Sequence, residues 1–348
     1  MRYLVLFCLL TPLTLFAESD SRRWAFLPVI AGSAETGVQL GVYAAHFLPY
    51  DPVKSRPSSV NGAVIGSLKK QIQGIVAPDL YVLQDKYHLE GYLIVRKWPA
   101  NFYGVGNNSP ERPEKYDARG FELSLTLQQS PYKNIFVGPY YRLFWEDISP
   151  DNLGAFAGVR GATGFRSSGL GVWAVYDTRD NPNAARAGGF VRYTGIVYHK
   201  IFGGDAHYRV QTFEVRRYFS VGTASSLGFA SYFRHVHGDV PFRDLSSPDG
   251  AFTFRGIEKG RYRDRDVLTL QSEVRFPLFG PFGMTLFGEL AQVAPGPDDF
   301  SFKFNAFKTS VGGGLRYALN PEQRFNVRLD TNWVDGAFGI TINVKEAF

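Results

Sequence analysis

A densely charged stretch, FRGIEKGRYRDRD, occupies residues 254–266 and holds five basic and three acidic side chains in thirteen positions. Guanidinium and carboxylate groups form directional, often bidentate ion pairs, and these pairs are strongest where water is partly excluded. Alone, the stretch fits a solvated loop, a nucleic-acid patch or a charged segment inside a hollow protein. The elements that surround it must decide between these interpretations.

Residues that could carry catalysis or hold a metal ion are sparse. His235 and His237 share one face of a strand, but only Asp239 offers a third ligand nearby. A lipid-facing hydrolase would need a serine–histidine pair, and although serines occur at 129–130 and 225–226, no motif marks a nucleophile. We therefore predict that the protein is not an enzyme and uses neither a metal nor a cofactor.

The N-terminus, MRYLVLFCLLTPLTLFA, has one arginine before an apolar run that ends near Phe16. This layout is typical of a secretory signal peptide, and we expect cleavage after Ala17, which leaves a single domain over 18–348. Cys8, the only cysteine, would be removed, so the mature chain would have no disulfide. The formal net charge would fall by one arginine, from +6 to +5, and its scatter along the chain argues against nucleic acid as a partner.

Period-2 alternation of apolar and polar residues dominates the rest of the sequence. In RFNVRLDTNW, for example, Phe325, Val327 and Leu329 fall on one face, and Arg328 and Asp330 fall on the other. A soluble sandwich turns such an apolar face inward, whereas a transmembrane barrel turns it toward lipid around a polar lumen. The number of segments and the lengths of their connections distinguish the two.

The alternating segments number about sixteen, and no run approaches the roughly 18 apolar residues of a membrane-spanning helix. We place them near residues 24–33, 37–48, 59–69, 70–83, 86–98, 117–129, 134–147, 165–179, 188–199, 205–218, 224–236, 266–277, 281–293, 308–318, 323–334 and 337–347. Short joins alternate with long polar loops, which we expect at 49–58, 99–116, 148–164, 237–265 and 294–307. The sequence therefore predicts an all-β fold: an up-and-down antiparallel transmembrane β-barrel of about sixteen strands.

Four motifs, in this order, resemble the bacterial surface antigen superfamily of outer-membrane barrels, which includes the barrel-assembly insertase and the two-partner secretion transporters. They are VYDTRDNPNAARAGGFVRY at 175–193, FRGIEKGRYRD at 254–264, LTLQSEVRFPL at 268–278, and GGGLRYAL at 312–319 followed by RFNVRLD. The resemblance covers nearly the whole mature chain.

The resemblance implies a position for the charged stretch. In the family this loop folds back into the barrel lumen, so Phe254, Arg255, Gly256 and Ile257 would form a lumen-inserted loop that plugs the barrel. The motif arginine is expected to pair with a carboxylate on the inner wall. In FGELA, Glu289 takes that position, and alternation independently places it on a polar face.

Two further sets of residues follow from the resemblance. Tyr176, Asp177, Arg179 and Asp180 match the YDTRDN strand and turn, where the family has a lumen-facing cluster. The cluster either seals and orders the turn or contacts the loop or a substrate. Phe348, an aromatic final residue in the apolar register, resembles the signal by which the barrel-assembly machinery recognises such chains for insertion.

The expected function follows from the same resemblance. It implies a protein of the outer membrane of a Gram-negative-type bacterium, in contact with outer-membrane lipid, that assists translocation or assembly of protein or lipid through a weak seam between its first and last strands. Only six residues separate Ala17 from Trp24, so we expect the barrel-only branch, without POTRA domains, and a separate periplasmic partner or a protein substrate. A passive or gated pore, a structural surface barrel, and a lipid-transfer or lipid-hydrolysing barrel stay open as alternatives.

Overall fold

The computed structural model describes residues 23–33, 37–49, 51, 53–110, 112–248, 252–258, 260–334 and 336–348. The expected signal peptide and its cleavage site lie outside the described residues. Within these residues, no helix has the length and apolar character needed to cross a bilayer.

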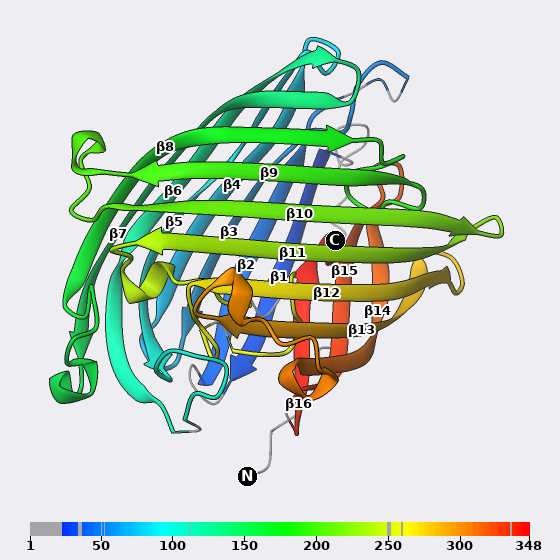
Figure 1. The fold of residues 1–348 in the computed structure, drawn as a ribbon. Helices are drawn as coiled ribbons and strands as arrows, with labels where there is room; N and C mark the ends of the chain where they lie inside the picture. Colours follow the sequence, from blue (N-terminus) through cyan, green and yellow to red (C-terminus); the bar gives the residue numbers. More distant parts are fainter. Residues whose placement is uncertain are drawn as a thin grey trace.

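Sixteen antiparallel strands follow one another in chain order within a single sheet, which curls into a barrel (Figure 1). The strands are β1 (Trp24–Ser33), β2 (Gly37–Phe47), β3 (Ser59–Ser67), β4 (Ile72–Val82), β5 (Tyr87–Phe102), β6 (Glu114–Tyr132), β7 (Ile135–Pro150), β8 (Gly164–Asp177), β9 (Gly188–Tyr198), β10 (Tyr208–Val221), β11 (Ser225–Gly238), β12 (Asp266–Pro277), β13 (Phe282–Ala294), β14 (Lys308–Asn320), β15 (Phe325–Val334) and β16 (Ala337–Val344). Short 3₁₀ turns lie between them at η2 (Leu153–Phe156), η3 (Lys200–Phe202), η4 (Phe242–Asp244), η5 (Pro297–Asp299) and η6 (Phe304–Ala306). The prediction of an all-β, up-and-down barrel of about sixteen strands is confirmed.

The alternation of side chains also matches the prediction. On β12, Leu270 and Val274 are exposed on the outside of the wall, whereas Thr269, Gln271 and Glu273 are buried on the inside. Buried polar side chains and exposed apolar ones are the reverse of the arrangement in a soluble protein. They are the arrangement of a barrel whose outer surface contacts lipid.

Three details of the predicted connections were wrong. The expected loop 99–116 is shorter, because β5 runs to Phe102 and β6 begins at Glu114, and the loop after β7 begins only beyond Pro150. Backbone pairing continues past the apolar band, since ladder hydrogen bonds do not require apolar side chains. In the up-and-down order, the long connection 49–58 also lies at the barrel end that carries most short turns. We call that end the turn end and the opposite one the loop end.

Phe325 does not face outward as its alternation predicted. Its ring is fully buried and packs edge-on against Phe47 of β2, with 5.1 Å between ring centroids. The ladder between β14 and β15 shifts register between Ala318 and Asn320, next to this position. A β-bulge of this kind re-aims side chains, which explains why strict alternation fails here.

The seam between β1 and β16 differs from every other strand junction. Consecutive strands are joined by antiparallel ladders, but no ladder joins β1 to β16 among the residues that the structure describes. Side chains bridge the gap instead: the Phe47–Phe325 contact lies across it, and Lys345 Nζ is 3.1 Å from Asp79 Oδ2 on β4. The ring expected from the sequence is therefore closed at this point by side chains.

Candidate functional site

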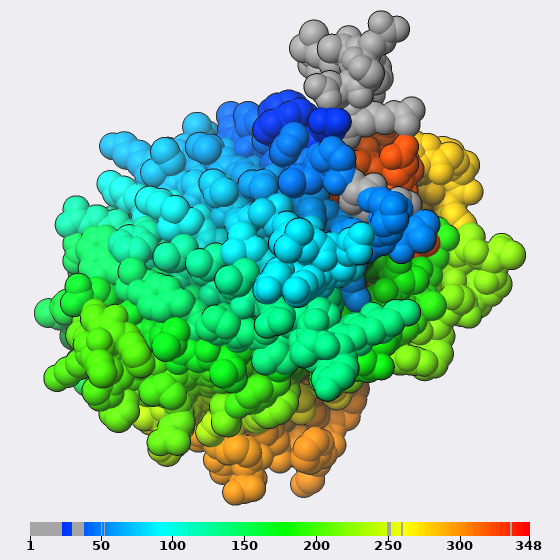
Figure 2. Space-filling model, turned by 90° about the horizontal axis from the view of Figure 1, so that it is seen from above, coloured from blue at the N-terminus to red at the C-terminus, as the bar shows by residue number. Residues whose placement is uncertain are grey.

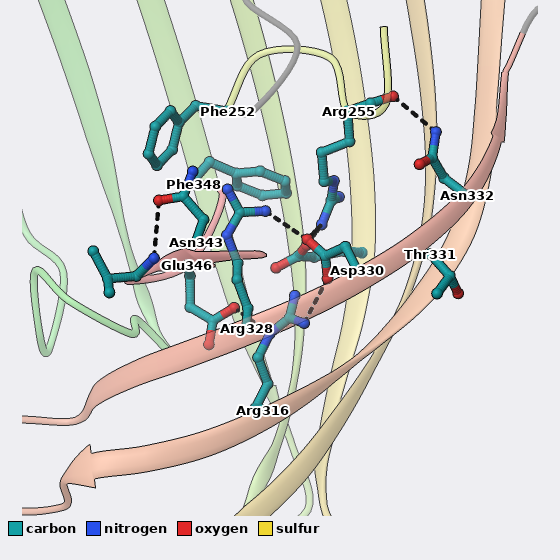
Figure 3. Close-up of polar contacts among 12 residues, drawn as sticks. Phe252, Arg255, Arg316, Arg328, Asp330, Thr331, Asn332, Asn343, Glu346 and Phe348 are labelled. Atoms are coloured by element: carbon teal, nitrogen blue, oxygen red, sulfur yellow. Dashed lines mark hydrogen bonds and ion pairs between the residues drawn. The ribbon is translucent and has the colours of Figure 1, made fainter. Parts of the chain in front are cut away.

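The predicted loop lies against the inner wall of the barrel. Phe254 and Arg255 are fully buried, and Phe254 packs with Ala291 of β13 and Val334 of β15. Figure 3 shows the Arg255 side chain pointing into a group of charged residues on the neighbouring strands. These contacts place residues 252–258 over the inward faces of β12 to β15.

Arg255 and Glu289 form the central contact. Arg255 Nε donates to Glu289 Oε1 at 2.6 Å, and the Arg255 backbone N–H donates to Glu289 Oε2 at 2.5 Å. Gln271 Nε2 donates to the same Oε1 at 2.8 Å and to the carbonyl of Phe252 at 2.7 Å. One carboxylate thus holds both the side chain and the backbone of the loop, and charge-assisted bonds of this kind are strong and directional.

Two more carboxylates and one aromatic ring surround the same guanidinium. Arg255 Nη1 lies 3.0 Å from Glu273 Oε2 and 3.5 Å from Asp330 Oδ2, and its central carbon lies 3.4 Å from the centroid of Phe287. Sequence reasoning missed these as partners of Arg255. Alternation placed Asp330 on a polar face, but only the register between strands brings Glu273 and Asp330 to one point.

Asp330 connects the loop to a wider network of ion pairs. Arg316 Nη1 lies 2.6 Å from Asp330 Oδ1, and Arg328 Nη1 lies 2.5 Å from Asp330 Oδ2 (Figure 3). Arg316 Nε also pairs with Glu346 at 2.8 Å. Each buried charge therefore faces opposite charges, as buried ions require.

Gly256 allows the tight backbone that follows Arg255. Its φ is +85°, and a Cβ here would stand 1.8 Å from Asn332 Nδ2. Asn332 Nδ2 and Ser310 Oγ each donate to the Arg255 carbonyl at 3.0 Å. A residue with a side chain would need a rare conformation and would displace Asn332 from this bond.

The YDTRDN residues form a second cluster at the turn end. Arg179 Nε and Nη2 donate to the two oxygens of Asp177 at 2.9 and 2.8 Å. Arg56, from the 49–58 connection, donates to Asp177 Oδ2 at 2.5 Å and was missed because nothing in its local sequence marks it. Tyr176 is 50% exposed and lies on the outer face, so it does not join this cluster.

Asp180 links the β8–β9 turn to the β14–β15 turn. Its Oδ2 lies 2.5 Å from Arg324 Nη1, and its Oδ1 accepts from the backbone N–H groups of Arg186 and Ala187. Burial alone would raise the pKa of Asp180, but the bonds from Arg324 and from the two backbone groups hold that pKa below its ordinary value. The β8–β9 turn thus contacts a turn that lies far away along the sequence.

The comparisons with known proteins bear on this geometry. Residues 74–326 match the family model described as the Omp85 superfamily domain, which is more than half of the chain. The chain belongs to the Omp85 superfamily.

Two solved structures share the Omp85 barrel fold with this chain. BamA from Haemophilus ducreyi, in a crystal structure lacking POTRA domains 1–3, aligns with a TM-score of 0.56 and 12% identity over 93% of this chain and 70% of that one. CdiB from Acinetobacter baumannii aligns with a TM-score of 0.53 and 13% identity over 94% of this chain and 66% of that one. No curated protein sequence matches the chain. Similarity at these identities concerns the fold.

Phe348 lies elsewhere than predicted for this Omp85 chain. β16 ends at Val344, Lys345 has a φ of +61°, and Phe348 is only 5% exposed instead of continuing the apolar face. Its ring packs near Tyr218 on the inner wall, and its main-chain oxygen accepts from Arg275 Nη2 at 2.6 Å. The expectation of a terminal aromatic in the outward register is wrong, because the backbone turns inward at Lys345.

The loop site of this Omp85 chain is held together by charge. Its groups are guanidinium ions, carboxylates and amides in mutual hydrogen bonds. His235 Nδ1 lies 2.6 Å from Asp266 Oδ1, outside the loop site, and no group of three or more potential metal ligands occurs in the described part of the chain.

Proposed function

We propose that this chain is an outer-membrane barrel that assists the assembly or translocation of protein, or of lipid, at the outer membrane of a Gram-negative bacterium. Membership of the Omp85 superfamily and the apolar outer surface support the location. The observation that carries the proposal is the seam. Among the described residues, no backbone ladder joins the facing edges of β1 and β16, whereas every other pair of neighbouring strands is hydrogen-bonded.

A strand edge without backbone hydrogen-bond partners is unfavourable in a bilayer. Backbone N–H and C=O groups that face hydrocarbon without partners cost several kcal/mol each, so such an edge readily accepts another strand. A substrate strand that pairs with β1 or β16 would satisfy these groups. The seam therefore supports a role in strand assembly, or in the release of a substrate sideways into the membrane. The barrel-assembly machinery would be a separate partner, which inserts this chain itself into the outer membrane.

The position of the loop favours a barrel with a plugged lumen and not an open pore. Arg255 is fully buried among Glu289, Glu273 and Asp330, so residues 252–258 occupy space that an open channel would leave to water. The alternative, a passive or gated pore, predicts a large and steady conductance in planar bilayers. The plugged barrel predicts small, noisy currents.

The proposal is tested by reconstituting the chain into phospholipid vesicles and adding an unfolded outer-membrane β-barrel protein diluted from urea. We expect that protein to fold several-fold faster than in vesicles without the chain, as followed by its heat-modifiable migration on gels. An equal folding rate, together with steady channel currents, would replace the proposal with the pore. Release of fatty acid from the vesicles would instead indicate a lipid-hydrolysing barrel.

A further inference from the structure

The connection between β13 and β14, residues 295–307, lies on the outside of the barrel. Phe300 packs against Phe233, an outward-facing residue of β11, with 6.1 Å between ring centroids. Gln292 is also on the outward side of β13, yet it is only 6% exposed. With its amide turned to satisfy both groups, Gln292 bonds the backbone N–H and C=O of Ser301.

The figures agree with these contacts. In Figure 1 the connection, drawn in orange, passes in front of β12 and β13, whose outer surfaces face the viewer. In Figure 2, turned by 90°, the orange residues protrude beyond the outline of the barrel wall. The segment therefore projects from the wall instead of covering the lumen.

The projecting segment carries large apolar side chains at its most exposed point. Phe302 is 82% exposed and Phe304 is 71% exposed, with the exposed Lys303 between them. Asn107 Nδ2 fixes the far side of the segment by donating to the carbonyl of Ala306 at 2.9 Å. Exposure of two phenylalanine rings to water is unfavourable. Rings that a fixed loop holds on the outside of the wall are therefore more stable in an apolar environment.

We propose that residues 300–304 form a lipid anchor that inserts Phe302 and Phe304 into the leaflet nearest the loop end. Lys303 would remain at the headgroup level. The occupant is lipid because the anchor is continuous with the lipid-facing surface: Leu270 of β12 and Phe229 of β11 are exposed on that face of the wall. Aromatic rings and lysine at a membrane boundary are the usual combination for interfacial anchoring.

This inference rests on the proposed membrane location and is tested by spin labelling in a Cys8→Ser background, which has no other cysteine. Phe302→Cys and Phe304→Cys are labelled with a nitroxide in phosphatidylcholine vesicles, and oxygen accessibility is compared with that of a water-soluble nickel complex. Leu270→Cys is the lipid-facing control, and Asp298→Cys, in the same connection, is the exposed polar control.

We expect the ratio of oxygen to nickel accessibility at 302 and 304 to resemble that at 270 and to exceed that at 298 several-fold. Nickel accessibility at 302 and 304 equal to that at 298 would overturn the anchor but leave the barrel in the bilayer. Low accessibility to both reagents, with dipolar broadening between labels, would also overturn it and indicate contact with a second copy of the chain. If position 270 is itself accessible to nickel, the membrane location fails first.

Discussion

The wall beneath the loop and the wall beside the seam are held together by different forces. Strands β12 to β15 are joined by continuous ladders, and over their inner faces Arg255 binds three carboxylates. At the junction of β1 and β16, the described residues show side-chain contacts only, such as Phe47 with Phe325 and Lys345 with Asp79. One region is fixed by buried charge and the other by contacts that can separate.

This difference shows how a barrel can be both rigid and able to open. Separating a ladder in a bilayer exposes backbone groups to hydrocarbon at several kcal/mol each. Separating the seam breaks side-chain contacts instead: the apolar cluster of Phe325 with Tyr43, Ala45 and Phe47, and one partly exposed ion pair. The seam is therefore the place where the barrel is expected to open first, while the loop keeps the neighbouring strands β12 to β15 in register.

Removing Glu289 should have the largest effect on this contrast. Glu289→Ala leaves a fully buried guanidinium without its nearest carboxylate, and we expect the free energy of unfolding to fall by about 3–5 kcal/mol. Urea unfolding in detergent, followed by heat-modifiable migration, measures this. The exchange Arg255→Glu with Glu289→Arg should not recover the loss, because the new carboxylate at position 255 would face Glu273 and Asp330. Asp298→Ala, in the exposed connection between β13 and β14, should change little. Equal stability of Glu289→Ala and the parent chain would show that the Arg255–Glu289 pair does not hold the loop against the wall.

Gly256→Ala should loosen the loop by a smaller amount. The added Cβ would meet Asn332 and hold a strained positive φ, so a loss of about 1–3 kcal/mol is expected in the same unfolding assay. Gly74→Ala on β4 is the matched control, because nothing lies within 4 Å of its Cβ position and its φ is ordinary. If both variants unfold alike, the loop backbone is not held by Asn332.

Breaking the side-chain link across the seam should have a small global effect and a local one. Lys345 and Asp79 are both partly exposed, so Lys345→Ala should lower the free energy of unfolding by only about 0.2–1 kcal/mol. Amide exchange should quicken in β16 and stay unchanged in β13. Faster exchange throughout the barrel would show that the seam is not an independent unit.

The turn-end link should make the smallest contribution and should depend on pH. Because the folded pKa of Asp180 is below its ordinary value, the Asp180–Arg324 pair stabilises the fold above the unfolded pKa of about 4, and this contribution is lost as pH falls through the folded value. Asp180→Asn should therefore reduce stability at pH 7 by less than about 1 kcal/mol and have less effect near pH 2. A deficit that grows on acidification would contradict the assignment.

Much of this arrangement was predictable from local pattern, and the remainder depends on distant pairing. Alternation identified the strands and the inward position of Glu289, because a strand turns successive side chains to opposite faces. It could not identify Glu273 and Asp330 as further partners of Arg255, since these lie on other strands whose register is not encoded locally. The contact of Arg56 with Asp177 and the inward turn at Lys345, which brings Lys345 to Asp79, were missed for the same reason. Each joins segments that lie far apart in the sequence.

Hydrogen exchange measured along the chain in a lipid bilayer tests the contrast between the two walls most directly. We expect the amides of β1 and β16 to exchange about ten-fold or more faster than those of β13 and β14, because opening at the seam breaks no ladder between β1 and β16. Equal protection of all four strands would mean a ring closed by backbone hydrogen bonds, and a barrel without the weak edge on which the proposed function depends.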